Sequence, residues 1–403
     1  MIRSFSCKNF YSFADENIVS LLVNDKAPIS DMYADSLSGE RISKALVIIG
    51  PNASGKTNLI KVLPFLKWFI LDSFKLKLDA EIPVKPFIFN NTKSNPTEIS
   101  IEFEIEKEIY EYFVSITNKR IIAEELKVKT KGKQRLTSKT LFTRNWNSKM
   151  EKYEFTGKNF KLPNDFKNSL RNNASIISIA NQFNHIGSKT ITNYWSKIRT
   201  NVVETGLPEN LFPFLSSFNF FNALEFYSEN KILKEKAEKI LARFDLGITS
   251  FDVKKEKKER GTSLDATVFH SINGGSFEIP IIYESSGTKQ LVTLLKSILQ
   301  VLEDGSTAIL DELDAYLHPD MVEALFELFI SPDTNTKNAQ IIFSTHSHRI
   351  LNQMDKYQII LTEKNDKGSS EAWRLDDVEG VRADDNYYAK YVAGAYGAVP
   401  NID

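Results

Sequence analysis

The sequence predicts an α/β fold that carries an antiparallel β meander and a helical insertion. An apolar strand at residues 46–49 leads through a glycine-containing loop into an apolar helical pattern that extends to about residue 78. Alternating apolar and polar residues then indicate three strands joined by short polar turns, at 98–105, 110–116 and 121–128. From residue 249 onward strands return, and they then alternate with helical patterns as in a second α/β half.

These changes of pattern divide the chain into three expected segments. Residues 1–149 hold the loop and the meander, and residues 246–403 hold the later strands and helices, the first strands at 251–255, 266–272 and 277–282. Residues 150–245 are poor in glycine and rich in Phe and Asn, so we expect a helical insertion there. The insertion shows no sustained heptads, which argues against a long coiled coil. Its helical patterns lie near 166–180, 190–203 and 228–244.

Composition and charge exclude several classes of protein. The 403 residues carry a formal net charge of −1, so no overall field favours nucleic acid or membrane, and any such binding must be local. The single cysteine, Cys7, excludes intrachain disulfides and thiolate zinc clusters and fits a reducing cytoplasm. No signal-peptide pattern is visible, and the most apolar run, at 63–74, is too short to span a bilayer. We therefore expect a cytoplasmic protein without a membrane segment.

The loop after the first buried strand matches the phosphate-binding pattern G-x-x-x-x-G-K-[ST]. Its glycines allow successive backbone N–H groups to point at phosphate oxygens, and the following helix N-terminus adds partial positive charge. Lys56 is expected to reach the β- and γ-phosphates, and the Thr57 hydroxyl to bind Mg²⁺. A chance match in a tight turn is the disfavoured alternative. The residues expected to hold the nucleotide in this loop are Gly50, Asn52, Ser54, Gly55, Lys56, Thr57 and Asn58.

Two later strands end in residues that could complete this site. The apolar run at 307–310 ends in Asp311 and Glu312. Asp311 is expected to hold Mg²⁺ through its water shell, and Glu312 to orient and deprotonate the attacking water. Many strands end in acids, but the phosphate loop in the same chain strengthens this interpretation. The strand at 340–344 leads to His346, which can contact the γ-phosphate if its strand tip lies beside the Asp-Glu strand.

A Ser-Gly pair and a basic stretch are weaker evidence for binding sites. Ser286 and Gly287 precede a helical pattern and could form an anion-binding cap, although alone they indicate only a helix start. The basic stretch is interpreted as a solvated hairpin, and the alternative is a rim that touches nucleic-acid phosphates. Its basic residues are Lys127, Lys129, Lys131, Lys133, Arg135, Lys139 and Arg144.

The order of these motifs resembles the ABC-type ATPase heads of the SMC/RecF/OLD group. That order is the phosphate loop, a long insertion, Ser-Ser-Gly-Thr at 285–288, Ile-Leu-Asp-Glu-Leu-Asp at 309–314, Leu-His-Pro at 317–319 and Ser-Thr-His-Ser at 344–347. The opening stretch 5–13 looks like the first strand motif of these heads. The stretch 382–400 is similar to the ending of stand-alone RloA/AbiLi-like ATPases of prokaryotic phage defence. The ATPase of the PARIS system is related to these proteins.

This resemblance implies a function as well as a fold. Two heads would dimerise head to tail around two ATP molecules with Mg²⁺, or form a higher oligomer. Ser286 and Gly287 of one subunit would cap the γ-phosphate held by Lys56 of the other, with Asp314 in the loop that crosses the interface and His346 as the γ-phosphate switch. ATP hydrolysis would control a separately encoded, nuclease-like effector. The alternatives are a RecF-like ATPase that clamps DNA and a scaffold that binds nucleotide and barely hydrolyses it.

Several features depart from the pattern of these relatives, among them the signature, which reads Ser-Gly-Thr-Lys-Gln at 286–290 rather than Ser-Gly-Gly-Gln. Tyr11 stands where many of them carry arginine, so that phosphate contact is lost or comes from Lys8. No glutamine lies between Thr57 and Lys133, so the metal-contacting glutamine has no assigned position. Only 57 residues follow His346, which is few for the nuclease domain of OLD-type relatives. The acidic pairs in that stretch are interpreted as solvated loops, and they are Asp376, Asp377, Asp384 and Asp385.

Overall fold

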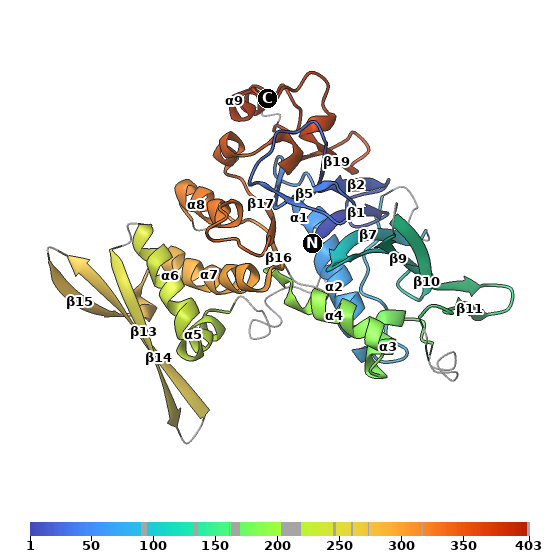
Figure 1. Cartoon of the computed structure of the whole chain (residues 1–403), viewed down its shortest axis with the longest axis horizontal. Helices are drawn as coiled ribbons and strands as arrows, with labels where there is room; N and C mark the ends of the chain where they lie inside the picture. The colour runs from blue at the N-terminus through green and yellow to red at the C-terminus, as the bar shows by residue number, and fades with distance from the viewer. Residues whose placement is uncertain are drawn as a thin grey trace.

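A six-stranded sheet forms the centre of the protein (Figure 1). In this computed structural model the described residues are 1–89, 95–132, 136–160, 162, 170–202, 219–244, 247–258, 261–272, 274–315 and 317–400. Five neighbouring strands of the sheet are parallel, and the sixth, β19 (Ser370–Arg374), is antiparallel at one edge. The strands, in sheet order, are β12 (Arg199–Thr200), β16 (Thr307–Leu310), β17 (Gln340–Ser344), β6 (Ala45–Ile49), β18 (Ile359–Lys364) and β19 (Ser370–Arg374).

The central sheet lies between two hydrophobic cores, which explains why its strands are apolar on both faces. All five residues of β6 are buried: Leu46 and Ile48 belong to one core, and Val47 and Ile49 to the other. Helices α1 (Lys56–Ile60) and α2 (Val62–Asp72) contribute to the first core. Helices α7 (Ser286–Asp304) and α8 (Pro319–Ile330) contribute to the second core. The apolar strands expected at 46–49, 307–310 and 340–344 are therefore confirmed.

The first helical pattern is shorter than expected. It divides into α1 and α2, and a 3₁₀ turn at Ser73–Lys75 follows α2 in place of a helix to residue 78. Ser73 explains the end of the helix, because its hydroxyl donates to Phe69 O and accepts a hydrogen bond from Ser175 N at 3.0 Å. These bonds tie the end of α2 to α3 (Ile176–Gln182).

A seven-stranded antiparallel sheet contains the predicted meander, which is confirmed with slightly longer strands. Buried residues alternate with partly exposed ones along β7 (Thr97–Ile105), as expected for a sheet with one face on the core. The residues between β2 and β6 form a small three-stranded sheet in the order β3 (Leu22–Val23), β5 (Arg41–Ser43) and β4 (Tyr33–Asp35). The seven strands, in sheet order, are β11 (Lys152–Thr156), β10 (Leu136–Asn147), β9 (Ile121–Lys131), β8 (Glu108–Ile116), β7 (Thr97–Ile105), β1 (Ile2–Lys8) and β2 (Asn17–Ser20).

The basic stretch forms the hairpin of β9 and β10, and several of its charges are paired. Lys129 forms ion pairs with Glu111 and, at 3.0 Å, with Glu102. Arg144 is fully buried and pairs with Glu124, so it belongs to the core and cannot form part of a rim. Lys133 and Arg135 lie outside the described residues. The paired charges favour the hairpin interpretation over a nucleic-acid rim.

The Glu124–Arg144 pair connects the meander to the start of α3. Arg144 donates to Arg171 O and Ala174 O, each at 3.0 Å, and Glu124 accepts from Ile176 N at 2.9 Å. Arg144→Ala is expected to lower the free energy of unfolding by about 3–5 kcal/mol, because it leaves a buried carboxylate unpaired. Urea denaturation measures the change, with the exposed Lys139→Ala on the same hairpin as a control. A loss no larger than that of the control would contradict this role.

The segment 150–245 is helical in large part, but it also contributes strands. The helices expected near 166–180, 190–203 and 228–244 overlap α3, α4 (Ile186–Lys197) and α6 (Lys231–Arg243), and α5 (Phe220–Glu229) adds another. Two of these expectations are wrong in part, because α3 begins only at Ile176 and because α4 ends at Lys197, after which residues 199–200 form a strand. Residues 163–169, where one helix was expected to begin, lie outside the described residues. β11 extends the meander sheet and β12 joins the central sheet, so the segment is interwoven with both halves.

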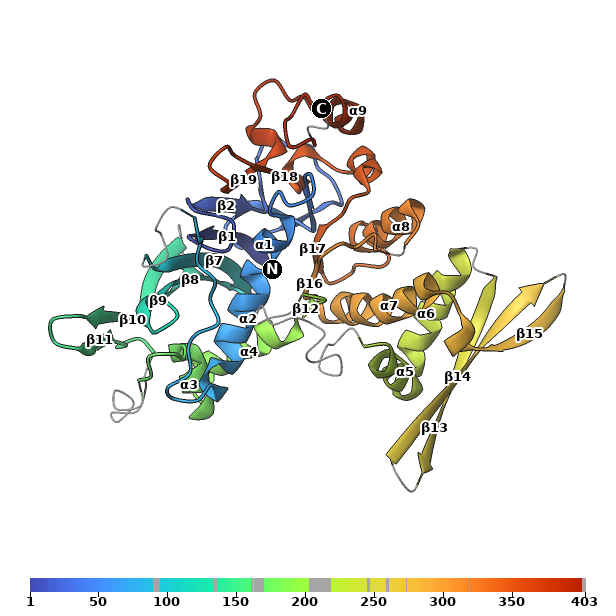
Figure 2. The same ribbon diagram turned by 180° about the vertical axis from the view of Figure 1, so that it is seen from behind.

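A three-stranded antiparallel sheet projects from the body beside α5 and α6 (Figures 1 and 2). Its strands β13 (Ile248–Lys258), β14 (Gly261–Ile272) and β15 (Gly275–Pro280) confirm those predicted after residue 249. A 3₁₀ turn at Ile281–Tyr283 follows β15. Near the end of the described residues lies the short helix α9 (Tyr387–Val392). No helix in the described ranges is long and apolar enough to cross a membrane. The remaining 3₁₀ turns are His348–Gln353, Lys356–Gln358 and Leu375–Asp377.

Candidate nucleotide site

The carboxyl ends of three adjacent strands bring the predicted site residues to one edge of the central sheet. β17 lies between β6 and β16, and all three strands are parallel. The phosphate loop follows β6, Asp311 and Glu312 follow β16, and His346 follows β17. Ligands of open parallel sheets bind at this edge, beyond the carboxyl ends of the strands.

The phosphate loop is shaped by close packing against β18 and β19. A Cβ atom at Gly50 would lie 2.2 Å from Thr362 O, so only glycine fits there. Gly55 has φ +117° and would place a Cβ 2.5 Å from the Ser370 hydroxyl. The Ser54 hydroxyl hydrogen-bonds the Thr362 hydroxyl at 2.7 Å. These contacts fix the loop that leads into α1.

The Lys56 side chain folds back over the loop. Its Nζ donates to Gly50 O at 2.8 Å and to Pro51 O at 3.0 Å. Burial lowers the Lys56 pKa, and the carboxylates of Asp311, Glu312 and Asp314 oppose that shift. The ammonium group therefore lies near the loop carbonyls and the acids, where a triphosphate would need a counter-charge.

Asp311 and Glu312 are held by hydrogen bonds from neighbouring elements. The Ser344 hydroxyl donates to Asp311 Oδ1 and accepts from Glu312 N at 2.8 Å. The Asn201 side chain makes two hydrogen bonds of 2.8 Å with the Asp311 backbone. Glu312 has φ +49°, an uncommon conformation for a residue with a side chain, and its carboxylate remains exposed. Strained residues of this kind cluster at functional sites.

His346 lies beside this acidic pair. Its Nε2 is 4.0 Å from Glu312 Oε1, and its backbone N–H donates to both carboxylate oxygens of Asp314 at 3.1 Å. The resemblance assigns Asp314 to a subunit interface. Within a single chain, its carboxylate fixes the backbone at His346.

The oxygen atoms present suit Mg²⁺. Asp311 supplies a carboxylate, and the Thr57 hydroxyl has no hydrogen-bond partner among the described residues. Hard oxygen ligands with several waters are the usual magnesium environment. No group of three or more His, Cys, Asp and Glu in the described ranges could hold a metal. A magnesium ion here would therefore depend on phosphate and water oxygens for its other ligands.

A cavity of about 560 Å³ opens over the phosphate loop. Loop residues 50–54, among them the exposed Asn52, form one side of it. His346 and His348 line it from the segment after β17, and Glu363 and Lys364 line it from the end of β18. The remaining lining residues, Tyr391, Val399 and Pro400, come from the last part of the described chain.

Residues 45–352 match the protein family described as "AAA domain, putative AbiEii toxin, Type IV TA system". The matched range covers most of the chain and includes the loop, Asp311, Glu312 and His346. The chain belongs to this P-loop ATPase family. No curated protein sequence matches the chain.

Solved structures with a similar fold include SMC head domains. The SMC head domain from Thermotoga maritima has 15% sequence identity and a TM-score of 0.43, covering 93% of this chain and 98% of that chain. The Smc head domain of Pyrococcus furiosus, bound to the C-terminal domain of ScpA, has 13% identity and a TM-score of 0.48, with coverages of 93% and 97%. The Pyrococcus yayanosii Smc head has 11% identity and a TM-score of 0.45, with coverages of 98% and 99%.

The predicted Ser-Gly cap lies apart from the phosphate loop of this P-loop ATPase. α7 follows β15 and runs back to β16, so its first turn lies at the end away from the central sheet (Figure 1). Ser285 is the N-cap, because its hydroxyl accepts from Thr288 N at 3.0 Å, and Ser286 is exposed. Ser286 and Gly287 do not line the cavity over the loop. Within one chain, Ser286 and Gly287 are therefore separate from the phosphate loop.

Asn58 and Lys8, both expected near the phosphates, make contacts within the protein instead. The Asn58 amide donates to the Ser12 hydroxyl at 3.0 Å, so its side chain supports the N-terminal hairpin. The Tyr11 ring lies 4.7 Å from the Lys61 ammonium group, whereas the exposed Lys8 pairs with Glu98 at 3.8 Å. Burial lowers the Lys61 pKa, and Asp311 opposes that shift. Lys61 is therefore the cation that packs on the Tyr11 ring.

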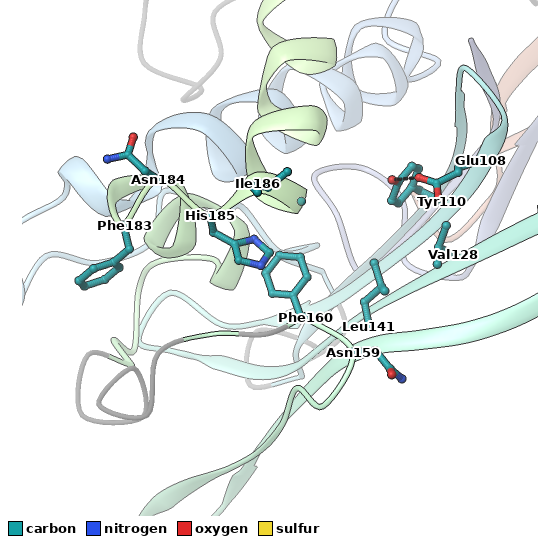
Figure 3. Close-up of a pocket in the computed structure, with 11 residues that line it drawn as sticks. Glu108, Tyr110, Val128, Leu141, Asn159, Phe160, Phe183, Asn184, His185 and Ile186 are labelled. Carbon is teal, nitrogen blue, oxygen red and sulfur yellow. Dashed lines mark hydrogen bonds between the residues drawn. The ribbon is translucent and has the colours of Figure 1, made fainter.

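A second cavity, of about 520 Å³, lies against β8 to β10 and the segment before α4 (Figure 3). Its His185 is occupied structurally: Nδ1 accepts from Ser188 N at 3.1 Å, and the ring packs 4.2 Å from that of Phe160. The Tyr110 hydroxyl donates to Glu108. This cavity is mainly apolar and brings together no phosphate-binding groups, so we do not assign the candidate nucleotide site to it.

Sequence reasoning missed three residues of this site: Asn201, Ser344 and His348. Ser344 had a signal, since a hydroxyl residue ends the strand beside the Asp-Glu strand. Asn201 had none, because its contact with Asp311 depends on the pairing of the two-residue strand β12 with β16. His348 follows His346 by two residues, and its part in the cavity depends on the far end of the chain.

Proposed function

We propose that this protein binds ATP with Mg²⁺ and hydrolyses it at a site completed by a second copy of the chain. The observation that carries the proposal is the meeting of Lys56, Asp311, Glu312 and His346 at one edge of the central sheet. In family terms it is an ABC-type head of the RloA/AbiLi-like kind, and its nucleotide state controls a separate effector in prokaryotic phage defence.

Each residue has a physical role in this reaction. Loop N–H groups and the Lys56 ammonium bind the β- and γ-phosphates. Thr57 and Asp311 hold Mg²⁺, which neutralises charge on the phosphates when bound. Glu312 accepts a proton from the attacking water, and the nearby His346 contacts the γ-phosphate. Ser286 and Gly287 of the other subunit complete the site, as the resemblance to ABC-type heads implies, and in their own chain they follow β15 at the start of α7, away from the phosphate loop.

A mixing experiment tests whether the site is shared. Ser286→Arg and Lys56→Ala should each be inactive alone, because every homodimer then lacks one half of both sites. An equal mixture should recover about a quarter of wild-type activity, because half of the dimers are mixed and each has one intact site. Ser196→Arg, an exposed serine on α4, is the matched control and should stay active. A mixture as inactive as its components would contradict the shared site.

The effector is proposed to be a separate polypeptide because the acidic pairs between residues 376 and 385 are engaged in ion pairs or in a backbone hydrogen bond. Asp376 pairs with Arg374, Asp384 with Arg382 at 3.3 Å, and Asp385 with Lys390 at 2.6 Å. Asp377 accepts from Arg374 N at 3.2 Å. Carboxylates held in this way do not converge on one metal.

Purified protein is therefore expected to cut no nucleic acid alone. The measurement is incubation with plasmid, single-stranded DNA and tRNA in the presence of ATP and Mg²⁺ or Mn²⁺. Cleavage that co-purifies with the protein and disappears when all four aspartates are replaced by alanine would contradict the separate effector. Cleavage that persists in that variant would indicate a contaminating nuclease.

A further inference from the structure

The last described residues form a fixed strap beside the nucleotide site. We define the C-terminal strap as residues 387–400, which include α9. The Tyr391 hydroxyl donates to Ala398 O at 2.7 Å, and Ala398 N donates to Glu363 Oε2 at 3.1 Å. Gly397 has φ +72°, and a Cβ there would lie 3.3 Å from both Glu363 and Trp373. The strap is thus stabilised by a hydrogen bond between two of its own residues, and it is anchored to β18 and β19.

The strap contacts a histidine that has no assigned role. The His348 ring packs edge-on against the Tyr391 ring, with centroids 4.8 Å apart and an interplanar angle of 63°. Among the described residues, neither nitrogen of His348 has a hydrogen-bond partner, and the side chain lines the cavity over loop residues 50–54. A half-buried imidazole with free nitrogens in a phosphate-loop cavity is available to a ligand.

Burial and the neighbouring groups together favour the neutral form of His348. Burial lowers the His348 pKa most, electrostatic interactions with His346 and Lys56 lower it further, and Asp314 opposes that shift. A neutral imidazole still carries one N–H donor. A hydrogen bond from such a donor to an ionised phosphate oxygen is charge-assisted and stronger than a neutral one.

We propose that His348 is a second histidine of the nucleotide site, which donates a hydrogen bond to the terminal phosphate of ATP. Tyr391 and the strap act as positioning groups that hold the imidazole toward the loop. The inference rests on the proposed function, because it takes ATP as the ligand. It adds a specific consequence: His348 favours ATP over ADP, since ADP lacks the terminal phosphate.

Calorimetry with a non-hydrolysable ATP analogue and with ADP tests this selectivity. His348→Phe keeps an aromatic ring against Tyr391 but removes the N–H. The affinity for the ATP analogue should fall about tenfold, the loss expected for one hydrogen bond to a charged group, and that for ADP should be unchanged. His348→Gln, which retains an N–H donor, should restore part of the loss. If His348→Phe does not fold, His348→Ala carries the same comparison.

The strap is tested by Tyr391→Phe, which keeps the ring contact and loses the bond to Ala398. It should weaken binding of the ATP analogue less than His348→Phe does and leave ADP binding unchanged. Tyr388→Phe, on the exposed side of the same helix, is the matched control and should bind both nucleotides normally. An equal loss for both nucleotides, or no loss in His348→Phe, would overturn the role of His348. Wild-type protein that binds neither nucleotide would overturn the proposed function as well.

Discussion

Glu312→Gln is expected to slow ATP hydrolysis by about two orders of magnitude or more while ATP binding persists. Glu312 follows β16, and the hydrogen bond from its N–H to the Ser344 hydroxyl fixes its backbone in a left-handed conformation. Glutamine preserves size and polarity but cannot accept the proton of the attacking water. Phosphate release in single-turnover experiments measures the step, and calorimetry measures binding.

A matched control separates this effect from a general change of charge. Glu327→Gln makes the same chemical change at an exposed position on α8 and should leave the rate unchanged. If Glu312→Gln hydrolyses ATP as fast as the wild-type protein, Glu312 is not the base. If the variant no longer binds ATP, its role is in binding instead.

Lys56→Ala is expected to abolish measurable ATP binding. The Lys56 ammonium group lies on the loop, where it donates to Gly50 O and Pro51 O, and its removal leaves the nearby acids to repel the triphosphate. The affinity should fall at least about 100-fold, which corresponds to the loss of one or two hydrogen bonds to charged groups. Calorimetry measures the loss, and Lys139→Ala is the control. Nucleotide affinity equal to the wild type would contradict the assignment of the phosphate loop.

Much of the central sheet could be predicted because its signals are local. The apolar runs at 46–49, 307–310 and 340–344 give buried parallel strands, and the loop pattern identifies its own chemistry. The meander follows from strict alternation along the strands. Since parallel strands end at one edge, the meeting of Lys56 with the residues after β16 and β17 also follows from the sequence order.

The parts that could not be predicted depend on contacts between distant residues. β12 has two residues and no periodicity, yet its pairing with β16 places Asn201 against Asp311. Arg144 looked like one more basic residue of a hairpin, and only the partner Glu124 explains its burial. Ser285 rather than Ser286 caps α7, a difference that the Ser-Ser sequence leaves open.

The mass of the Glu312→Gln protein in solution, with and without ATP, tests the central claim most directly. ATP should persist in this variant, and the shared site should hold two copies together around it. Light scattering is therefore expected to show a mass at least twice that of the 45.9 kDa chain with ATP and Mg²⁺, and a lower mass when Ser286→Arg is added to the same chain. A monomer at saturating ATP, with nucleotide binding confirmed by calorimetry, would contradict the account.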